Sequence, residues 1–356
     1  MDKLIRIIAH SIESKATDIH ISEYEYVRIR SQGKLNTINE IFSKDEIENL
    51  VKYLLNEDQF SVLENKRAID FSKQLDDLGN FRFNIYYFNS KLALSIRVLP
   101  LKIPTLEELG YPSIIKDTIK DRMGLVLISG PTGSGKSTLI ASLINEINKN
   151  EQKHIITIED PIEYRYVSEK SLIHQREVNQ DVNDYHQGLV QALRQDPDVI
   201  VLQEMRDAET MFTVLNAAET GHLVFATVHT NGAAMTIDRI VDAFPGDKRD
   251  YIAYLLASVL NYVVSLQLVP RSDGTGLVGV AEFLKINNTM QNLIRERKTF
   301  QIDSFMATQQ LDGMITLEAY LANLVNKDII KYEEALRRCR NINLFNSYIK
   351  MKKTLG

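Results

Sequence analysis

A glycine-rich segment near the middle of the chain has the residue types and spacing that bind phosphate groups. It fits the pattern G-x-x-x-x-G-K-[ST] and reads Gly130-Pro131-Thr132-Gly133-Ser134-Gly135-Lys136-Ser137-Thr138. Its glycines let successive backbone N–H groups turn toward a β-phosphate, and a following helix would add its positive N-terminal end. Lys136 can reach the β- and γ-phosphate oxygens, and the Ser137 hydroxyl can coordinate Mg²⁺. The segment therefore predicts a nucleotide site.

The residues on either side of this loop favour phosphate binding over a glycine-rich turn without a ligand. Leu125–Ile128 is an apolar run typical of a buried strand, and residues 139–147 carry apolar side chains at helical spacing. Strand, loop and helix thus follow in the order that a phosphate loop requires.

Two acidic segments follow other predicted strands. Val199–Leu202 leads to Glu204, and an acid at the carboxyl end of a strand can hold the Mg²⁺ shell, directly or through water. Ile158–Glu163 places three carboxylates beyond another strand end, where a base could polarise an attacking water. Acids there would repel a polyanion unless Mg²⁺ or arginines compensate, which favours a functional role over a solvated acidic turn. Asp198, at the opposite end of its strand, is predicted to be structural.

Two histidines, His222 and His229, lie at the ends of a further predicted strand, Leu223–Val228. A single histidine would most often be a satisfied polar residue, but this pair suggests γ-phosphate sensing or acid–base chemistry. A shared metal ion is disfavoured, because an extended strand of this length separates the two by on the order of 20 Å.

Residues 1 to about 100 carry helix and strand patterns without a phosphate loop. Apolar spacing predicts a helix over 4–12, and a capping box at Ser43 and Glu46 predicts a second helix. Strands are predicted over 18–21, 26–30, 81–88 and 92–99, and the strand 26–30 continues through a turn at 31–34 into a hairpin whose second strand starts at Leu35. These patterns indicate an α+β domain with a largely antiparallel sheet, and Pro100 and Pro104 bracket an extended linker.

From about residue 105 onward, predicted strands and helices alternate, which is typical of a parallel sheet covered by helices. The predicted strands are 125–128, 154–159, 199–202 and 222–228, and the predicted helices are 187–195 and 209–218. Beyond Pro245 the pattern is helical, apart from a hairpin predicted over 265–268 and 277–283. The residues from Asn341 onward are too weakly patterned to assign.

Composition and charge narrow the class of protein. A net charge of −5 over 356 residues argues against a protein that coats nucleic acid. The single cysteine, Cys339, excludes an internal disulfide framework and fits a reducing cytosol. The N-terminus lacks the pattern of a signal peptide, and no stretch is long and apolar enough to cross a membrane, so we expect partners to recruit the chain to any membrane.

Four sequence motifs, taken together, resemble those of a known protein family. The phosphate loop, Ile158–Glu163, Glu204–Asp207 and Gly221–Thr230 resemble the Walker A, Asp-box, Walker B and His-box segments of the secretion ATPases of type II secretion and type IV pili, in that family's order. The resemblance covers nearly the whole chain. It implies an α/β fold in which a PAS-like α+β N-terminal domain (1–99) and a linker (100–106) precede a RecA-like P-loop ATPase core with a helical C-terminal region (107–356).

Within that family the chain looks most like the pilus retraction motors. It begins at the PAS-like domain, marked by Thr17-Asp18-Ile19-His20, without the extra N-terminal domain of the assembly ATPases, and it lacks their four-cysteine zinc insert. Residues 293–302 resemble the C-terminal segment that retraction requires. The resemblance implies a homo-hexamer that is cytoplasmic, binds ATP and Mg²⁺ between its two domains, and acts on an inner-membrane pilus platform protein.

Residue roles are carried over by position in the motifs. The resemblance implies that Glu163 is the catalytic base, that Glu204 holds the Mg²⁺ shell, and that His222 and His229 form the His-box pair. Arginines of the N-terminal domain approach the nucleotide in this family.

Three arginines match such family positions. Arg82 and Arg97 occupy the corresponding strands of the N-terminal domain, although arginine alternating with apolar residues is also typical of the solvated face of a strand. Arg239 matches an arginine near the phosphates or the subunit interface, and it could equally form a structural ion pair with Asp238 or Asp242.

Two positions depart from the family pattern. Gln203 stands where glycine usually precedes the Walker B acid, and its side chain could crowd the site or contact water; Arg297 stands where the retraction motors commonly have glycine. The closest alternative function is an assembly, competence or type II secretion ATPase. A scaffold ring that binds ATP with little turnover, and a RecA-like nucleic-acid motor, are the alternatives from other classes.

Overall fold

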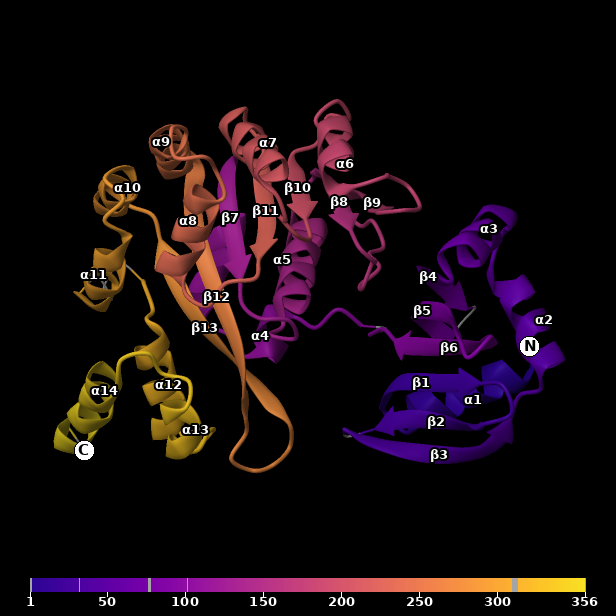
Figure 1. Ribbon diagram of the computed structural model, residues 1–356. Helices are drawn as coiled ribbons and strands as arrows, with labels where there is room; N and C mark the ends of the chain where they lie inside the picture. The colour runs from indigo at the N-terminus through magenta and orange to yellow at the C-terminus, as the bar shows by residue number, and fades with distance from the viewer. Residues whose placement is uncertain (1, 32, 76–77, 101, 309–312, 356) are drawn as a thin grey trace. The chain divides into compact units, whose positions relative to one another are not determined.

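The computed structural model describes residues 2–31, 33–75, 78–100, 102–308 and 313–355 (Figure 1). Contacts divide the chain into two compact units. The first contains Met1–Lys102 and Pro161–Arg165, and the second contains Ile103–Asp160 and Tyr166–Gly356. Within the described ranges, no helix is both long enough and apolar enough to cross a membrane.

The first unit is built on a six-stranded sheet in the order β3-β2-β1-β6-β5-β4, in which every neighbouring pair is antiparallel. Its strands are β1 (Ala16–Ser22), β2 (Tyr26–Ser31), β3 (Lys34–Ile41), β4 (Ala68–Leu75), β5 (Gly79–Phe88) and β6 (Lys91–Val98). Its helices are α1 (Asp2–Glu13), α2 (Lys44–Leu54) and α3 (Glu57–Lys66). The largely antiparallel α+β architecture predicted for this part of the chain is confirmed.

Local sequence explains where these helices begin and which face they bury. Helix α1 places Leu4, Ile7 and Ile8 in the core of the first unit. Helix α2 begins with the predicted capping box, in which the Ser43 hydroxyl accepts from the Glu46 N–H and the Glu46 carboxylate accepts from the Ser43 N–H.

The second unit contains a seven-stranded sheet in the order β13-β12-β7-β11-β10-β8-β9. Its strands are β7 (Gly124–Ser129), β8 (His154–Glu159), β9 (Leu172–Glu177), β10 (Val199–Leu202), β11 (Leu223–Val228), β12 (Leu260–Pro270) and β13 (Leu277–Lys285). All neighbouring pairs are parallel except β12 and β13, which form an antiparallel hairpin longer than the sequence predicted. Strands β7, β10 and β11 are buried at every position, as expected for a sheet covered on both faces.

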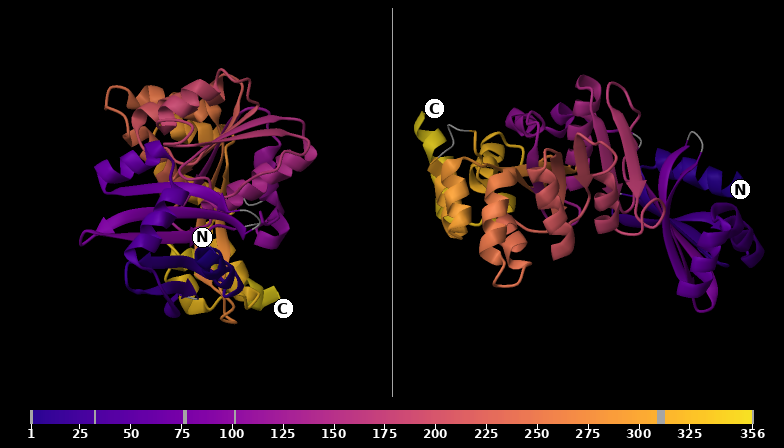
Figure 2. Two further views of the ribbon diagram at one scale, coloured as in Figure 1. Left: turned by 90° about the vertical axis from the view of Figure 1, so that its right-hand side faces the viewer. Right: turned by 90° about the horizontal axis from the view of Figure 1, so that it is seen from above.

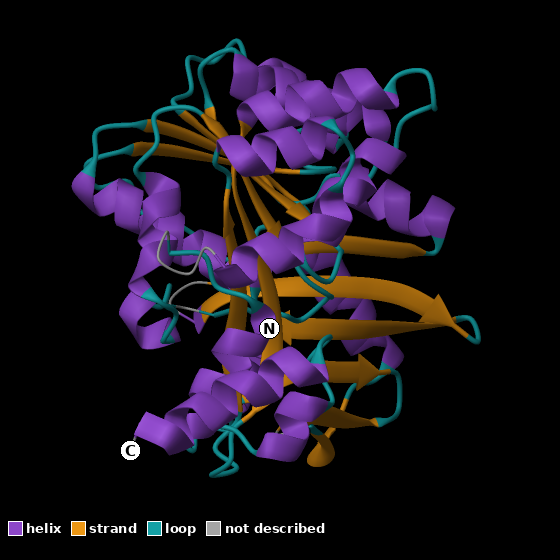
Figure 3. Cartoon of the chain, turned by 90° about the vertical axis from the view of Figure 1, so that its left-hand side faces the viewer, coloured by secondary structure: helices purple, strands orange, loops and turns teal. Residues whose placement is uncertain are grey.

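Helices cover both faces of this sheet, which Figures 2 and 3 show from three further directions. The helical segments are α4 (Leu106–Leu109), η2 (Ser113–Ile119), α5 (Lys136–Asn150), α6 (Tyr185–Ala192), α7 (Ala208–Glu219), α8 (Ala233–Asp242), α9 (Arg249–Val259), α10 (Asn288–Arg295), η3 (Thr299–Gln301), α11 (Ile302–Thr308), α12 (Leu317–Asn326), α13 (Tyr332–Leu336) and α14 (Ile342–Leu355). Alternate strand residues face two separate cores. Leu125 and Leu127 pack with α6, α7, α8, α9 and α10, whereas Val126 and Ile128 pack with α5.

The C-terminal helices form a further hydrophobic cluster at the β12–β13 hairpin (Figure 1). Val269 of β12 and Val280 of β13 pack there with Leu321 of α12 and Phe345 of α14. Helix α14 occupies the segment that the sequence pattern left unassigned.

A buried ion pair ties this C-terminal region to the sheet. Arg340 Nη2 lies 2.6 Å from Glu282 Oε2, and the Glu282 side chain is only 3% exposed. The backbone N–H groups of Arg340 and Asn341 donate to Glu318 Oε1 at 2.9 and 3.0 Å. Burial raises the pKa of Glu282, and the charge of Arg340 opposes that rise. The arginine therefore compensates a carboxylate that water does not reach.

Replacing Arg340 with Met is expected to lower the free energy of unfolding by about 3 kcal/mol, because it leaves the Glu282 carboxyl buried without its cation. Chemical denaturation would measure the change. Arg337→Met is the matched control: Arg337 is 73% exposed, and its ion pair among the described residues is with nearby Glu334, so about 0.5 kcal/mol or less is expected. Equal effects of the two substitutions would contradict this role for Arg340.

Arg297 closes helix α10 in a conformation that glycine usually adopts. Its φ is +54°, its N–H donates to Ile294 O at 3.0 Å, and the N–H of Lys298 donates to Leu293 O at 2.8 Å. This pair of hydrogen bonds is a Schellman motif. The guanidinium lies 3.8 Å from Asp250 and 4.0 Å from Asp242, so two long ion pairs accompany the strained backbone.

Arg297→Gly is expected to raise the free energy of unfolding by about 1 kcal/mol, because glycine adopts a left-handed conformation without the steric cost of a Cβ. Arg297→Ala removes the same ion pairs but keeps the Cβ, so it should not stabilise the fold. Thermal unfolding of the three proteins measures both effects. A glycine variant no more stable than the alanine variant would show that backbone strain is not the dominant contribution.

Candidate active site

Residues 130–135 connect β7 to α5 at the carboxyl edge of the sheet, and Lys136, Ser137 and Thr138 form the first turn of α5 (Figure 1). Gly130 is required there, since a Cβ at this position would lie 2.4 Å from Leu266 O and 2.5 Å from Ser134 Oγ. Gly135 precedes α5 with φ +93° and makes no side-chain cap. No side chain therefore caps the first turn of α5, and N–H groups at a helix start are of the kind that bind anions.

Two polar side chains in the loop fit a phosphate group. Ser134 is 2% exposed, and its Oγ has no hydrogen-bond partner among the residues that the structure describes. Lys136 Nζ donates to the carbonyl oxygens of Gly130 at 2.8 Å and Pro131 at 3.0 Å. A buried hydroxyl without a partner, uncapped N–H groups and an ammonium group thus converge on one loop, and all of them are donors suited to phosphate oxygens.

Glu204 and His229 extend this constellation. Lys136 Nζ lies 3.3 Å from His229 Nδ1, and His229 Nε2 lies 3.4 Å from Glu204 Oε1. Burial lowers the pKa of His229, and the charge of Lys136 lowers it further, outweighing Glu204. A neutral ring that accepts from Lys136 at Nδ1 donates to Glu204 from Nε2. The predicted residues Lys136, Glu204 and His229 are therefore brought together at one edge of the sheet.

Arg206 and Tyr185 also belong to this constellation. Arg206 Nε donates to Glu204 Oε2 at 2.8 Å, and its guanidinium carbon lies 5.7 Å from the centre of the Tyr185 ring. Neither residue was assigned a role from the sequence. Arg206 follows the Walker B acid closely enough to have been suspected, but nothing in the sequence near Tyr185 pointed to Glu204.

His222 lies at the other edge of the sheet. It precedes the amino end of β11, which runs parallel to β7, so the length of the strand separates it from the phosphate loop. Its Nδ1 donates to Ala217 O at 2.9 Å. Within one chain the structure does not bring His222 together with His229, and a catalytic role for His222 stays a prediction.

Arg82 and Arg97 line a pocket on the sheet of the first unit with Asp18 and Asp70. Arg97 Nε lies 2.9 Å from Asp18 Oδ1, and Arg82 Nε lies 3.6 Å from Asp70 Oδ1. Burial alone would raise the pKa of Asp18, but the hydrogen bonds and charge of Arg97 and a hydrogen bond from Thr17 hold it below its usual value. Both guanidinium groups remain partly exposed, so each arginine keeps donors for a further anion.

The remaining predicted residues are Glu163 and Arg239. Glu163 lies in Pro161–Arg165, which groups with the first unit, so its role at the phosphate loop stays a prediction. Arg239 is exposed on α8, and no ion pair of its side chain occurs in the described part of the chain. Thr299 donates to Asp238 and Arg249 pairs with Asp242, so the structure does not support the alternative of a structural ion pair for Arg239.

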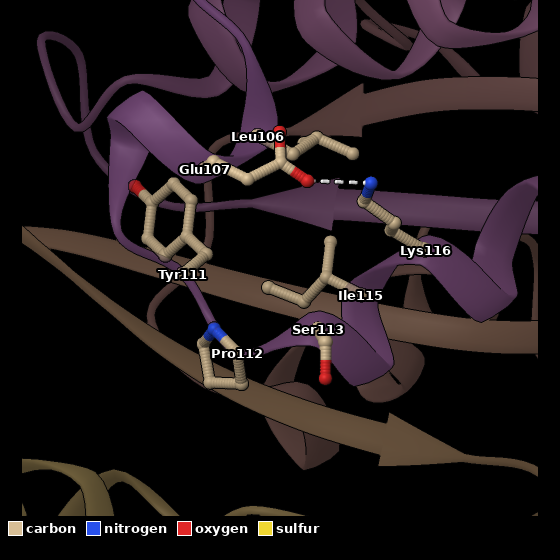
Figure 4. Close-up of a pocket in the computed structure, with 7 residues that line it drawn as sticks. All are labelled: Leu106, Glu107, Tyr111, Pro112, Ser113, Ile115 and Lys116. Atoms are coloured by element: carbon tan, nitrogen blue, oxygen red, sulfur yellow. Dashed lines mark ion pairs between the residues drawn. The ribbon is translucent and has the colours of Figure 1, made fainter.

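Two pockets in the second unit were not foreseen from the sequence. One adjoins the phosphate loop and is lined by Pro131, Thr132, Gly133, Ser134, Asn231, Gln267, Leu268, Arg337 and Arg338. The other, drawn in Figure 4, lies at residues 106–116, where Glu107 and Lys116 form an ion pair of 2.6 Å. Lys116 also pairs with Glu146, well along α5 from the phosphate loop. The Tyr111 hydroxyl, which also lines this pocket, lies 3.8 Å from the place of a Cβ at Gly135, so the pocket extends to the phosphate loop at that residue.

Comparison with known proteins agrees with this arrangement. Residues 1–337 match the family model described as Type II/IV secretion system protein. A twitching motility protein of Neisseria gonorrhoeae is 44% identical over 88% of this chain and 84% of its own length. The type IV pilus retraction ATPase PilT of Pseudomonas aeruginosa is 38% identical over 95% and 98% of the two chains.

Solved structures lead to the same family. A crystal structure of the pilus retraction motor PilT with bound ADP matches with a TM-score of 0.90 and 39% identity, covering 96% of this chain and 98% of that one. This match confirms the α/β fold predicted from the sequence, with an antiparallel N-terminal domain, a RecA-like core and C-terminal helices. The chain thus belongs to the type II/IV secretion system protein family, and it is a PilT-like P-loop ATPase of that family.

Proposed function

We propose that this chain is the subunit of a hexameric, cytoplasmic motor that hydrolyses ATP to retract type IV pili. The observation that carries the ATPase chemistry is the convergence of Lys136, His229 and Glu204 beside a phosphate loop with uncapped donors. The likeness to PilT and to a twitching motility protein favours retraction as the use of that chemistry.

The chain's own groups divide the work of hydrolysis. Lys136 exchanges two loop carbonyls for phosphate oxygens, while Ser134 and the first N–H groups of α5 bind the same phosphates. Ser137 and Glu204 would hold Mg²⁺, which supplies charge neutralisation at the β- and γ-phosphates when bound. Glu163 takes a proton from the attacking water, and Arg82, Arg97 and Arg239 offset developing negative charge.

Assembly of subunits into a ring would convert ATP hydrolysis into movement. We propose that ATP binds between the N-terminal domain (1–99) and the core (107–356), joined by the linker 100–106. Hydrolysis shifts one domain against the other and against the neighbouring subunit. The motion reaches a platform protein of the inner membrane, which recruits the ring to the inner face of that membrane, and pilin subunits leave the base of the fibre. No role for nucleic acid is proposed, in keeping with the net charge of −5.

The test is to place Glu204→Ala in the chromosome of the source organism and to count surface pili by electron microscopy. Excess pili on cells that no longer move over surfaces are the expected result. Loss of pili would instead indicate a pilus assembly ATPase with the same chemistry. Turnover by the purified protein that persists in Glu163→Gln would argue against the proposed base.

A further inference from the structure

Gln203, the residue immediately before Glu204, has a side chain that contacts the start of the other acidic segment. The backbone N–H of Asp160 donates to Gln203 Oε1. The hydroxyl of Tyr185 donates to the same oxygen at 3.3 Å. One amide oxygen thus accepts from the Asp160 backbone and from helix α6, rather than crowding the phosphate loop.

The backbone around Gln203 fixes the direction of this side chain. Its N–H donates to Ile158 O at 3.0 Å, and its carbonyl oxygen accepts from the Thr227 hydroxyl. Met205 N–H donates to Thr227 O at 3.1 Å on the neighbouring strand end. Strands on both sides hold the backbone of Gln203. The side chain therefore starts from a fixed backbone position when it contacts Asp160.

Tyr185 connects the same amide to the Glu204 carboxylate. Burial raises the pKa of Tyr185, so its phenol stays protonated and donates to Gln203. Its ring lies against the Arg206 guanidinium, which donates to Glu204 at 2.8 Å. Gln203 therefore connects Asp160 to Glu204 by two routes. One is the peptide bond to Glu204, and the other runs through the Tyr185 ring and the Arg206 guanidinium. A glycine at this position has no side chain that could make either contact.

We propose that Gln203 is a positioning residue for ATP hydrolysis. Its side-chain oxygen fastens Asp160, which directly follows β8, to the strand end that carries Glu204, so that the segment leading to Glu163 starts from a fixed point. Glu163 is three residues beyond Asp160, with Pro161 limiting the backbone between them. This inference rests on the proposed function, since it requires that Glu163 acts on water at bound ATP.

Gln203→Met keeps the length of the side chain but removes the acceptor. Single-turnover and steady-state assays with radiolabelled ATP should show kcat about tenfold lower and KM changed less than about twofold, because the orientation of the base is disturbed and ground-state binding is not. Gln152→Met, the same substitution at an exposed residue, should leave kcat unchanged. An unchanged kcat in Gln203→Met would overturn the inference.

A double-mutant cycle separates positioning from a structural role. In a Glu163→Gln background, Gln203→Met should cost less than about twofold, because the base that it positions has already been removed. The same tenfold loss in both backgrounds would overturn the inference. Tyr185→Phe, which removes only one hydroxyl, tests the same link if Gln203→Met fails to fold. It should lower kcat about twofold to threefold in wild type and leave the Glu163→Gln protein unchanged.

The wild-type protein distinguishes this inference from the function on which it rests. Absence of turnover in wild type would overturn the proposed ATPase motor and the positioning role with it. Wild-type turnover that responds to Glu163→Gln but not to Gln203→Met would overturn the positioning role alone.

Discussion

Lys136→Ala is expected to lower kcat/KM for ATP hydrolysis by at least about 100-fold, because it removes the only side-chain cation of the phosphate loop. This ammonium group donates to two loop carbonyls and lies 3.3 Å from His229, so it belongs to the loop in which phosphates are expected to bind. A coupled phosphate-release assay measures the loss.

Lys149→Ala is the matched control for this experiment. Lys149 is exposed in the last turn of α5, the same helix that Lys136 begins, so its loss tests charge and helix stability without touching the loop. We expect wild-type turnover from this variant. Comparable losses in both variants would mean that the effect arises from folding rather than from phosphate binding.

Glu163→Gln is expected to lower kcat by about 1000-fold while leaving the affinity for ATP within about threefold of wild type. The amide keeps the shape of the side chain but cannot take a proton from water, and a positioned base contributes about 10²- to 10⁴-fold. Rapid-quench measurement of product formation, combined with titration of a fluorescent ATP analogue, separates chemistry from binding.

A nearby exposed carboxylate supplies the control for this substitution. Glu169→Gln makes the same change of charge a short distance along the chain, at a side chain directed to solvent, and should turn over ATP normally. If instead Glu163→Gln retained full activity, the attacking water would have to be activated by another group, and Glu159 and Asp160 would be the next residues to examine.

The fold was predictable where burial is symmetrical and difficult to predict where it is not. Strands β7, β10 and β11 lie between two helical layers, so each is a continuous apolar run that the sequence displays openly. Edge strands lack that signal. Strand β3 is mostly exposed, and the sequence predicted only its start at Leu35, as the second strand of a hairpin. Strand β9 has a single buried residue and was not predicted, because exposure leaves no regular alternation of apolar and polar residues.

Some residues of the candidate site could also be predicted from the sequence, and others could not. Lys136 and Glu204 follow directly from strand–loop patterns, because the carboxyl ends of parallel strands meet at one edge of the sheet. The sequence also placed His222 and His229 at opposite ends of one strand, and β11 separates them in the structure. Tyr185 approaches Gln203 because α6 packs against β10. The spacing of residues along the sequence does not predict which helix packs against which strand.

The buried pair between Glu282 and Arg340 makes early termination costly for this gene product. A premature stop codon between the end of α12 and residue 340 would delete the cation but keep Glu282, and its carboxylate would be buried without that cation. It would also remove α14, whose Phe345 is fully buried against the same hairpin. We expect cellular proteases to clear such a destabilised polypeptide, so frameshifts that remove residues 340–345 should lower the abundance of the protein sharply.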